Sequence, residues 1–255
     1  MKPAARAFTL LEVMMVILIL AILLAGLSVP LATQVALRRQ EETRRILDEA
    51  REAVLGFAAT QGRLPCPASA ASRGKESFAA GGSALDGNCS NFHDGFLPAA
   101  SLGLSPLDSE GFARDGWGSP ANRVRYAVFG AGRAIGGVAN PLTRAGGMRQ
   151  ATLPELGDAS GYLVICGLGS ASNATGCGPA VNQLTRRAAF VLLSTGPNAT
   201  ATPAAGTDES RNLDGNAVFV SRDPSAARGD EFDDTLAWVP VNVLVGRLVS
   251  AGRLP

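Results

Sequence analysis

The chain has 255 residues, a length that fits one or two domains, and a formal net charge of +1. This nearly neutral balance excludes broad electrostatic attraction to nucleic acid or to a charged membrane surface. Apolar residues make up 46% of the chain but are concentrated in its first thirty positions, and its 30 glycines and 15 prolines favour a loop-rich globular domain over a helical bundle for the remainder.

The first segment, residues 1–29, is basic at its start and apolar afterwards. Lys2 and Arg6 precede seventeen uncharged residues, 13–29, which would span roughly 26 Å as a helix and match the core of a bilayer. A cleaved secretory signal has a shorter apolar stretch and a small-residue cleavage site, and no such site follows here. The segment therefore predicts a retained membrane anchor, with its N-terminus in the cytoplasm because Lys2 and Arg6 lack acidic neighbours.

The residues at the start of this anchor resemble a known processing site. Residues 7–13, AFTLLEV, resemble the leader junction of type IV prepilins and type II secretion pseudopilins. The resemblance implies that a membrane prepilin peptidase cuts between Ala7 and Phe8 and methylates the new amine of Phe8. The family usually has glycine before the cut, so we expect Ala7 to slow processing.

The same resemblance gives Glu12 a role in assembly. A carboxylate at the centre of a membrane helix costs about 2.5–3.5 kcal/mol, but a buried amine and a buried carboxylate each lower the other's desolvation cost. In a filament, the Phe8 amine of one subunit would meet Glu12 of its neighbour and set the axial register. The alternatives are that Glu12 reaches the membrane interface or pairs with the amine of its own chain.

Residues 30–62 continue the helix in amphipathic form. Leu47, Ala50, Val54 and Phe57 recur at spacings of three and four and form one apolar stripe, and Gly62 predicts the end of the helix. A coiled coil is the alternative, although only about two clean heptads are present. We expect one helix of roughly fifty residues, whose stripe a sheet or another helix must cover.

All four cysteines, Cys66, Cys89, Cys166 and Cys177, follow the apolar run. An even number on one side of a membrane predicts two disulfides in an oxidising compartment. Three connectivities are possible, and we expect the sequence-local pairs, Cys66 with Cys89 and Cys166 with Cys177. Buried free thiols or a zinc site are the alternatives, but the sequence has no CxxC spacing and no second histidine to support zinc.

The rest of the chain predicts an α+β domain. Residues 66–122 have no long apolar run, so we expect an irregular region with short helices, for example near 97–102. Strand candidates follow at 123–129, 161–166, 188–194, 216–221 and 235–239. Since no helical segments alternate regularly with them, we expect an antiparallel sheet. A C-terminal helix is expected between Pro240 and Gly252.

The expected organisation is a leader at 1–7, a membrane and assembly helix at 8–29, its amphipathic continuation at 30–62 and a periplasmic α+β domain at 63–255. One long N-terminal helix on an antiparallel sheet is the pilin-like architecture that the resemblance implies. Two short stretches, residues 115–120 (DGWGSP) and 194–198 (STGPN), resemble major secretion pseudopilins. Ordinary turn chemistry is the alternative for both, but they favour a secretion pseudopilin over a pilus subunit.

Metal and catalytic signals are weak. Asp230, Asp233 and Asp234 offer the oxygen ligands that calcium prefers, and the resemblance to major pseudopilins implies a calcium site near the C-terminal end. Their spacing matches no fixed calcium loop, so no cofactor is expected and calcium is the one candidate. Residues 130–137, GAGRAIGG, lack the dinucleotide fingerprint and predict a hairpin. His93 is expected at the surface or in a turn, and it could pair with Asp94.

The sequence therefore predicts a structural subunit and not an enzyme. We expect a minor pilin or pseudopilin of a type II secretion pseudopilus or a type IV pilus, located in the bacterial inner membrane. Its expected partners are other pilin or pseudopilin subunits and the prepilin peptidase, and no nucleic acid. The alternative is a membrane-anchored periplasmic binding protein or enzyme that keeps an uncleaved signal anchor. Glu12 and the Ala7–Phe8 junction separate the two, because an ordinary anchor needs neither.

Overall fold

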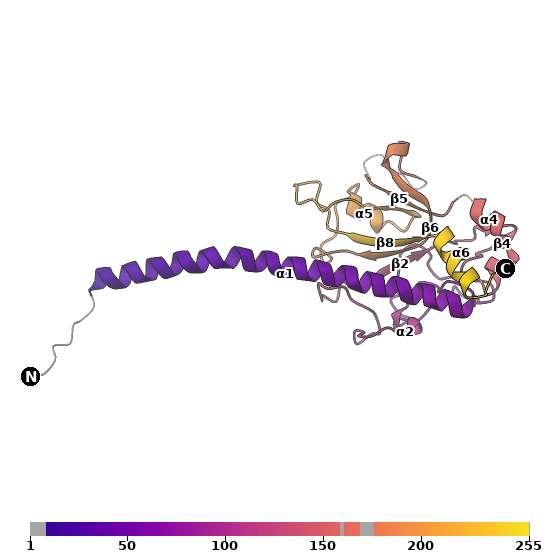
Figure 1. Cartoon of the computed structure of the whole chain (residues 1–255), viewed down its shortest axis with the longest axis horizontal. Coiled ribbons are helices and arrows are strands. Elements are labelled where there is room, and N and C mark those ends of the chain that lie inside the picture. The colour runs from indigo at the N-terminus through magenta and orange to yellow at the C-terminus, as the bar shows by residue number, and fades with distance from the viewer. Residues whose placement is uncertain (1–8, 159–160, 169–175, 255) are drawn as a thin grey trace, which may run out of the picture. The chain divides into compact units, whose positions relative to one another are not determined.

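A computed structural model describes residues 9–158, 161–168 and 176–254, with side chains at all of these positions except residues 23–32 and 158 (Figure 1). The expected leader junction, Ala7 and Phe8, lies outside the described residues. The chain divides into two compact units, Met1–Glu41 and Glu42–Pro255. The two units are described separately.

A single helix, α1, covers Leu10–Gln61 and has 52 residues, which confirms the expected long N-terminal helix. In the first unit the apolar side chains that the structure describes, at 10–22 and 33–37, are exposed, as at Leu10 and Ile17. No helix in the described part of the chain combines the length and the apolarity that a membrane crossing requires. The helix ends at the expected residue, Gly62, whose N–H donates to Ala58 O at 2.8 Å and whose φ of +69° favours glycine.

In the second unit, α1 buries the predicted stripe. Leu47, Ala50 and Val54 are almost completely buried, and they belong to one cluster with residues from alternate positions of the sheet. The sheet residues in this cluster include Tyr126, Val128, Phe190, Leu192 and Val239. Phe57 of the same stripe is only half-buried. The compact unit thus starts within α1, at Glu42, because the stripe is covered by the sheet.

The main sheet has six strands: β1 (Gly95–Phe96), β2 (Arg125–Val128), β5 (Leu163–Cys166), β6 (Gln183–Ser194), β7 (Val218–Val220) and β8 (Thr235–Pro240). Their order is β1-β2-β6-β5-β7, and β8 pairs with β6. The strand β6 begins five residues before the expected 188, because its polar start pairs with β5 through Thr185 and Gln183.

The expectation of a wholly antiparallel sheet is wrong at one pair. β5 and β7 are parallel, with Val164 opposite Val218, whereas the other neighbours in the sheet are antiparallel. The chain between β5 and β7 passes through β6 and the helix α5 (Asp208–Asn212). This long connection brings the chain back in the same direction, as parallel pairing requires.

The two faces of the sheet bury different clusters because side chains alternate along each strand. Phe190 and Leu192 of β6 face the cluster that includes α1, whereas Val191 lies in a second cluster with Ala127, Leu163 and Phe219. A third cluster surrounds Cys166 and Cys177. The structure forms both sequence-local disulfides, Cys66–Cys89 and Cys166–Cys177.

Short elements complete the second unit. The helix expected near 97–102 is α2 (Ala99–Leu102), and the glycine-rich stretch forms the expected hairpin, β3 (Ala134–Ile135) with β4 (Val138–Ala139). The others are α3 (Gly147–Gln150), α4 (Leu153–Asp158) and the 3₁₀ helix η1 (Ala180–Asn182).

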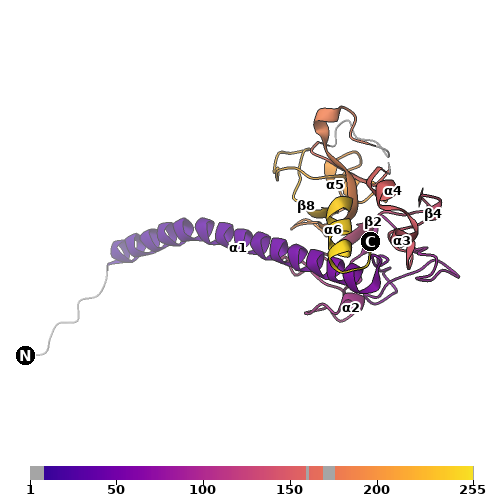
Figure 2. The ribbon, with the colours of Figure 1, turned by 45° about the vertical axis from the view of Figure 1, so that its right-hand side comes forward.

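The expected C-terminal helix is α6 (Val241–Ser250), which follows Pro240 directly. Its residues Leu244 and Leu248 are buried in the cluster that includes α1. Figures 1 and 2 show α6 beside the last turns of α1, where Arg253 Nε donates to Ala59 O at 2.9 Å. Residues just after α6 therefore satisfy a carbonyl that the end of α1 leaves open.

Candidate functional site

The first candidate site is the start of α1, where Glu12 lies in the first turn. The Glu12 N–H is 3.3 Å from the Thr9 hydroxyl and 3.1 Å from the Thr9 carbonyl oxygen. Thr9 and Glu12 have the spacing of a capping box, and a carboxylate in the first turn complements the helix dipole. The sequence analysis assigned Glu12 to assembly and did not identify this local role. The Glu12 side chain itself is exposed in the first unit.

The second candidate site is a buried group of polar side chains, the polar junction, made of Thr43, Asp115, Asn122 and Ser194. Asp115 Oδ2 accepts hydrogen bonds from Ser194 Oγ at 2.5 Å and from Asn122 Nδ2 at 3.1 Å. Its other oxygen accepts from the Trp117 N–H at 2.9 Å. Burial raises the pKa of Asp115, and the hydrogen bond from Ser194 opposes that shift.

The polar junction also connects segments that are distant in sequence. The Gly116 N–H donates to Thr43 Oγ1 of α1 at 3.1 Å, and Asn122 Nδ2 donates to Gly196 O at 2.5 Å. The two stretches singled out in the sequence, residues 115–120 and 194–198, therefore contact each other. The first of them also contacts α1. Their meeting point could not be read from the sequence because each stretch has only a turn signal of its own.

Next to the polar junction lies an acidic cluster of Glu209, Asp233 and Asp234. One carboxylate oxygen from each of them lies within 4.8 Å of the other two. Glu209 comes from α5, which Thr207 caps by accepting from the Ser210 N–H at 3.3 Å. Asp233 and Asp234 directly precede β8. Glu209 and Asp234 are buried, and Asp233 is half-buried.

Neutral donors hold the acidic cluster. Asn198 Nδ2 lies 3.0 Å from both Glu209 oxygens, and the Asp233 N–H donates to Glu209 Oε1 at 3.0 Å. Asn212 Nδ2 donates to Asp234 Oδ2 at 2.7 Å. Asp233 Oδ1 is buried and has no hydrogen-bond partner among the described residues. None of the ion pairs in the described part of the chain involves these three carboxylates.

The electrostatics of the acidic cluster follow from this burial. Desolvation raises the pKa of Asp233 to about 6, and the charge of Glu209 adds to the effect. Desolvation also raises the pKa of Asp234 to about 8, although the hydrogen bond from Asn212 acts against it. The cluster therefore favours protons or a cation over three free negative charges.

The residues of the acidic cluster fit calcium chemically, because they offer only oxygen ligands and because Asp233 Oδ1 lacks a donor. Of the three sequence candidates, Asp233 and Asp234 lie in the cluster. Asp230 lies outside it, since its carboxylate accepts from Arg222 at 2.7 Å, and Arg222 also pairs with Asp208. The sequence analysis did not identify Glu209, which precedes Asp233 by 24 residues and forms no motif with it.

His93 and Asp94 do not form the pair that was considered for them. His93 is half-buried, and burial lowers its pKa. Asp94 instead forms an ion pair with Arg125 of β2.

Comparison with known proteins locates one family feature. Residues 2–28 match the model of the prokaryotic N-terminal methylation motif. No curated protein and no solved structure is significantly similar to the chain. The match confirms the resemblance to type IV pilin-like proteins and indicates processing by a prepilin peptidase.

Proposed function

We propose that this chain, which carries an N-terminal methylation motif, is a minor pilin or pseudopilin: a structural subunit of a type II secretion pseudopilus or a type IV pilus. The observation that carries the proposal is the motif at residues 2–28. It is supported by the helix α1, which continues without a break from the motif into the second unit, where its stripe packs on a sheet. The proposed partners are other subunits of the same kind.

The proposed maturation begins in the bacterial inner membrane. The peptidase cuts between Ala7 and Phe8, methylates the Phe8 amine and leaves residues 8–29 as the membrane and assembly segment. The second unit then lies in the periplasm, where oxidation suits two disulfides. In the filament, Glu12 meets the Phe8 amine of a neighbouring subunit and sets the axial register.

Mass spectrometry of the N-terminal peptide tests this proposal. The full chain is produced in cells with and without an active prepilin peptidase. We expect a mature chain that starts at methylated Phe8 only when the peptidase is present. A chain that still begins at Met1 in cells with the active enzyme would support the alternative, a periplasmic binding protein or enzyme on an uncleaved anchor.

We also propose that the acidic cluster binds calcium. Glu209, Asp233 and Asp234 would hold the ion, and Asp233 Oδ1 would gain the partner that it lacks among the described residues. Calcium would supply positive charge that the neighbouring asparagines cannot supply. The expected effect is structural, since the cluster connects α5 to the start of β8.

A further inference from the structure

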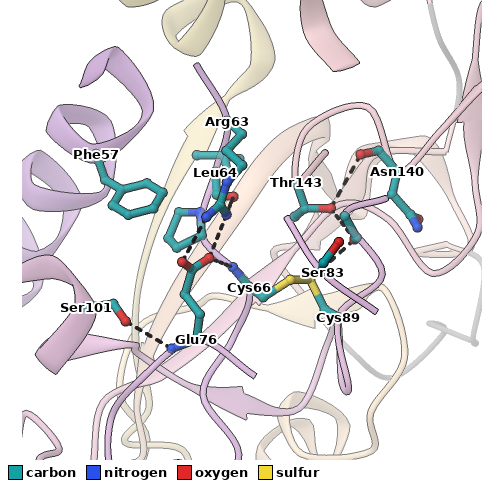
Figure 3. A network of polar contacts seen from close by, with 12 residues as sticks. Phe57, Arg63, Leu64, Cys66, Glu76, Ser83, Cys89, Ser101, Asn140 and Thr143 are labelled. Carbon is teal, nitrogen blue, oxygen red and sulfur yellow. Dashed lines mark hydrogen bonds and ion pairs between the residues drawn. A yellow bond between two sulfur atoms is a disulfide. The ribbon is translucent and has the colours of Figure 1, made fainter. Parts of the chain in front are cut away.

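A buried ion pair lies beside the first disulfide, just beyond the end of α1 (Figure 3). Arg63 donates from Nη1 to Glu76 Oε1 at 2.6 Å and from Nη2 to Glu76 Oε2 at 2.9 Å. The backbone N–H of Cys66 donates to the same Oε1 at 2.8 Å. The carboxylate of Glu76 thus receives three hydrogen bonds from the short segment that carries Cys66. We call the Arg63–Glu76 pair the clasp.

The clasp is shielded from water. The side chains of Arg63 and Glu76 are 9% and 13% exposed. The guanidinium carbon of Arg63 lies 5.1 Å from the centre of the Phe57 ring and 5.9 Å from that of Phe78. Figure 3 shows Phe57 facing this pair. Removal of one partner from such a pair would leave an uncompensated buried charge, so the docked arrangement of the two segments requires both Arg63 and Glu76.

Glu76 directly precedes the two residues, Ser77 and Phe78, that pair with the segment carrying Cys89. The Ser90 N–H donates to Ser77 O at 2.9 Å, and Phe78 pairs with Cys89 across an antiparallel bridge. Because Cys89 lies opposite Phe78, the position of Glu76 determines where Cys89 lies. The clasp therefore brings the Cys89 segment to the Cys66 segment without any covalent bond.

Both segments have a further anchor in common. The Leu64 N–H donates to Leu142 O at 2.6 Å, and Thr143 Oγ1 donates to Gly87 O at 2.7 Å. Figure 3 shows Thr143 on the Cys89 side of the disulfide. Neighbouring residues, 142 and 143, thus hold one segment each. None of these hydrogen bonds is made by a cysteine sulfur.

We propose that the clasp selects the Cys66–Cys89 disulfide during oxidative folding. It docks the two segments while all four cysteines are still thiols, so that Cys66 meets Cys89 and not Cys166 or Cys177. Cys66 and Cys89 share the core cluster of α1, whereas Cys166 and Cys177 lie in a separate cluster. Three connectivities are possible for the four cysteines. The clasp favours the native one because it holds the Cys66 and Cys89 thiols close to each other.

The oxidation itself is ordinary thiol–disulfide exchange with an external disulfide, for which glutathione disulfide is the probe. One cysteine thiolate attacks glutathione disulfide and releases one glutathione thiolate. The second cysteine thiolate attacks the mixed disulfide at the protein sulfur and releases the other. Two protein thiols are oxidised, one glutathione disulfide is reduced, and the two protons end on two glutathione molecules.

Refolding of the full chain tests the proposal. The reduced, denatured chain is refolded in glutathione buffer, quenched by alkylation and analysed by peptide mapping. We expect mainly native pairs for the unchanged chain, and for Glu76→Gln at least about tenfold more pairing of Cys66 with Cys166 or Cys177. The matched control is Asp108→Asn, which removes a buried ion pair with Arg123 at 2.9 Å whose partners bond to neither cysteine segment among the described residues.

Equal pairing in Glu76→Gln and in the unchanged chain would overturn the proposal, and so would equal scrambling in Asp108→Asn. A second variant covers the case in which Glu76→Gln does not fold. Cys66→Ser with Cys89→Ser should keep slow hydrogen exchange at the residue 66 amide, because Glu76 still accepts that N–H. Fast exchange at this amide in an otherwise folded chain would mean that the disulfide holds the clasp, and would overturn the proposal as well.

Discussion

Ser194 donates a hydrogen bond to Asp115 at 2.5 Å across 79 positions of sequence. This contact joins the end of β6 to the turn that precedes β2, and Gly116 in the same turn contacts Thr43 of α1. The polar junction therefore ties the sheet to the helix through side chains that are all buried.

We predict that Ser194→Ala lowers the free energy of unfolding by about 1–3 kcal/mol, because Asp115 loses a donor in a site that water does not reach. Urea unfolding of the full chain measures this change. Ser250→Ala is the matched control, since the Ser250 hydroxyl donates to Gly246 O in an exposed position. Equal effects of the two substitutions would contradict the role of the polar junction.

The raised pKa values of Asp233 and Asp234 predict that the free energy of unfolding falls as pH rises. Burial raises their pKa values to about 6 and about 8, whereas the unfolded chain keeps values near 3.8. Between pH 4 and pH 8 the folded state therefore binds more protons than the unfolded state. The stabilisation is complete below about pH 4 and is lost as pH rises through 6 and 8.

Urea unfolding in EDTA at pH 5 and pH 8 measures this dependence. His93, whose pKa is lowered by burial, acts in the opposite direction, so the comparison with Asp234→Asn is the decisive one. We expect the loss between pH 5 and pH 8 to be smaller in that variant by at least about 1 kcal/mol. The same loss in both proteins would show that Asp234 is ionised throughout this range.

Calcium is predicted to stabilise the folded chain through Glu209. A ligand at a hundred times its dissociation constant stabilises by about 2.7 kcal/mol, which thermal unfolding detects as a higher Tm. We expect Glu209→Gln to lose most of this response. Asp230→Asn is the matched control, because Asp230 pairs with Arg222 outside the acidic cluster. A calcium response that depends on Asp230 and not on Glu209 would place the ion elsewhere.

Glu12→Ala is predicted to separate insertion from assembly. The substitution removes a costly group from the proposed membrane segment, so membrane levels and cleavage should be normal. In a filament it leaves the Phe8 amine of a neighbour unpaired, at a cost of about 3–5 kcal/mol, which lowers incorporation more than a hundredfold. Glu12→Gln should be intermediate because it keeps a hydrogen-bonding group.

Recovery in the assembled fraction, or in cross-links to partner subunits, measures the effect of Glu12→Ala. Glu41→Ala is the control, since it removes an exposed carboxylate from the same helix. If Glu12→Ala assembles as well as the unchanged chain, Glu12 has only its local role in the first turn of α1.

Local patterns predicted the elements whose side chains carry a clear period. The stripe of Leu47, Ala50 and Val54 predicted the packed face of α1, and Pro240 and Gly252 bounded the segment that contains α6. The hairpin β3–β4 followed from its glycines. In these cases the signal lies within a short stretch of sequence, because a helical period, a helix boundary or a turn depends mainly on residues near one another in the chain.

Long-range relationships could not be predicted in this way. The parallel pair of β5 and β7 depends on a connection of about fifty residues. The local period of each strand does not show which direction this connection gives to the next strand. Glu209 joins Asp233 only because α5 and the start of β8 lie side by side in the fold. Arg63 and Glu76 likewise look like ordinary surface charges in the sequence, and only the fold shows that they form a buried pair.

The strand β6 pairs with β2, β5 and β8 and supplies Phe190 to one core and Val191 to the other. Adjacent residues of a strand point to opposite faces, so a slip by a single position exchanges every side chain between the two sides of the sheet. A residue inserted between Ala189 and Phe190 would therefore move Phe190 to the position where Val191 now fits and would leave the α1 side underfilled. Length variation between related chains should accordingly be absent from β6 and concentrated in segments such as the β3–β4 hairpin, which has no strand partner outside itself among the described residues.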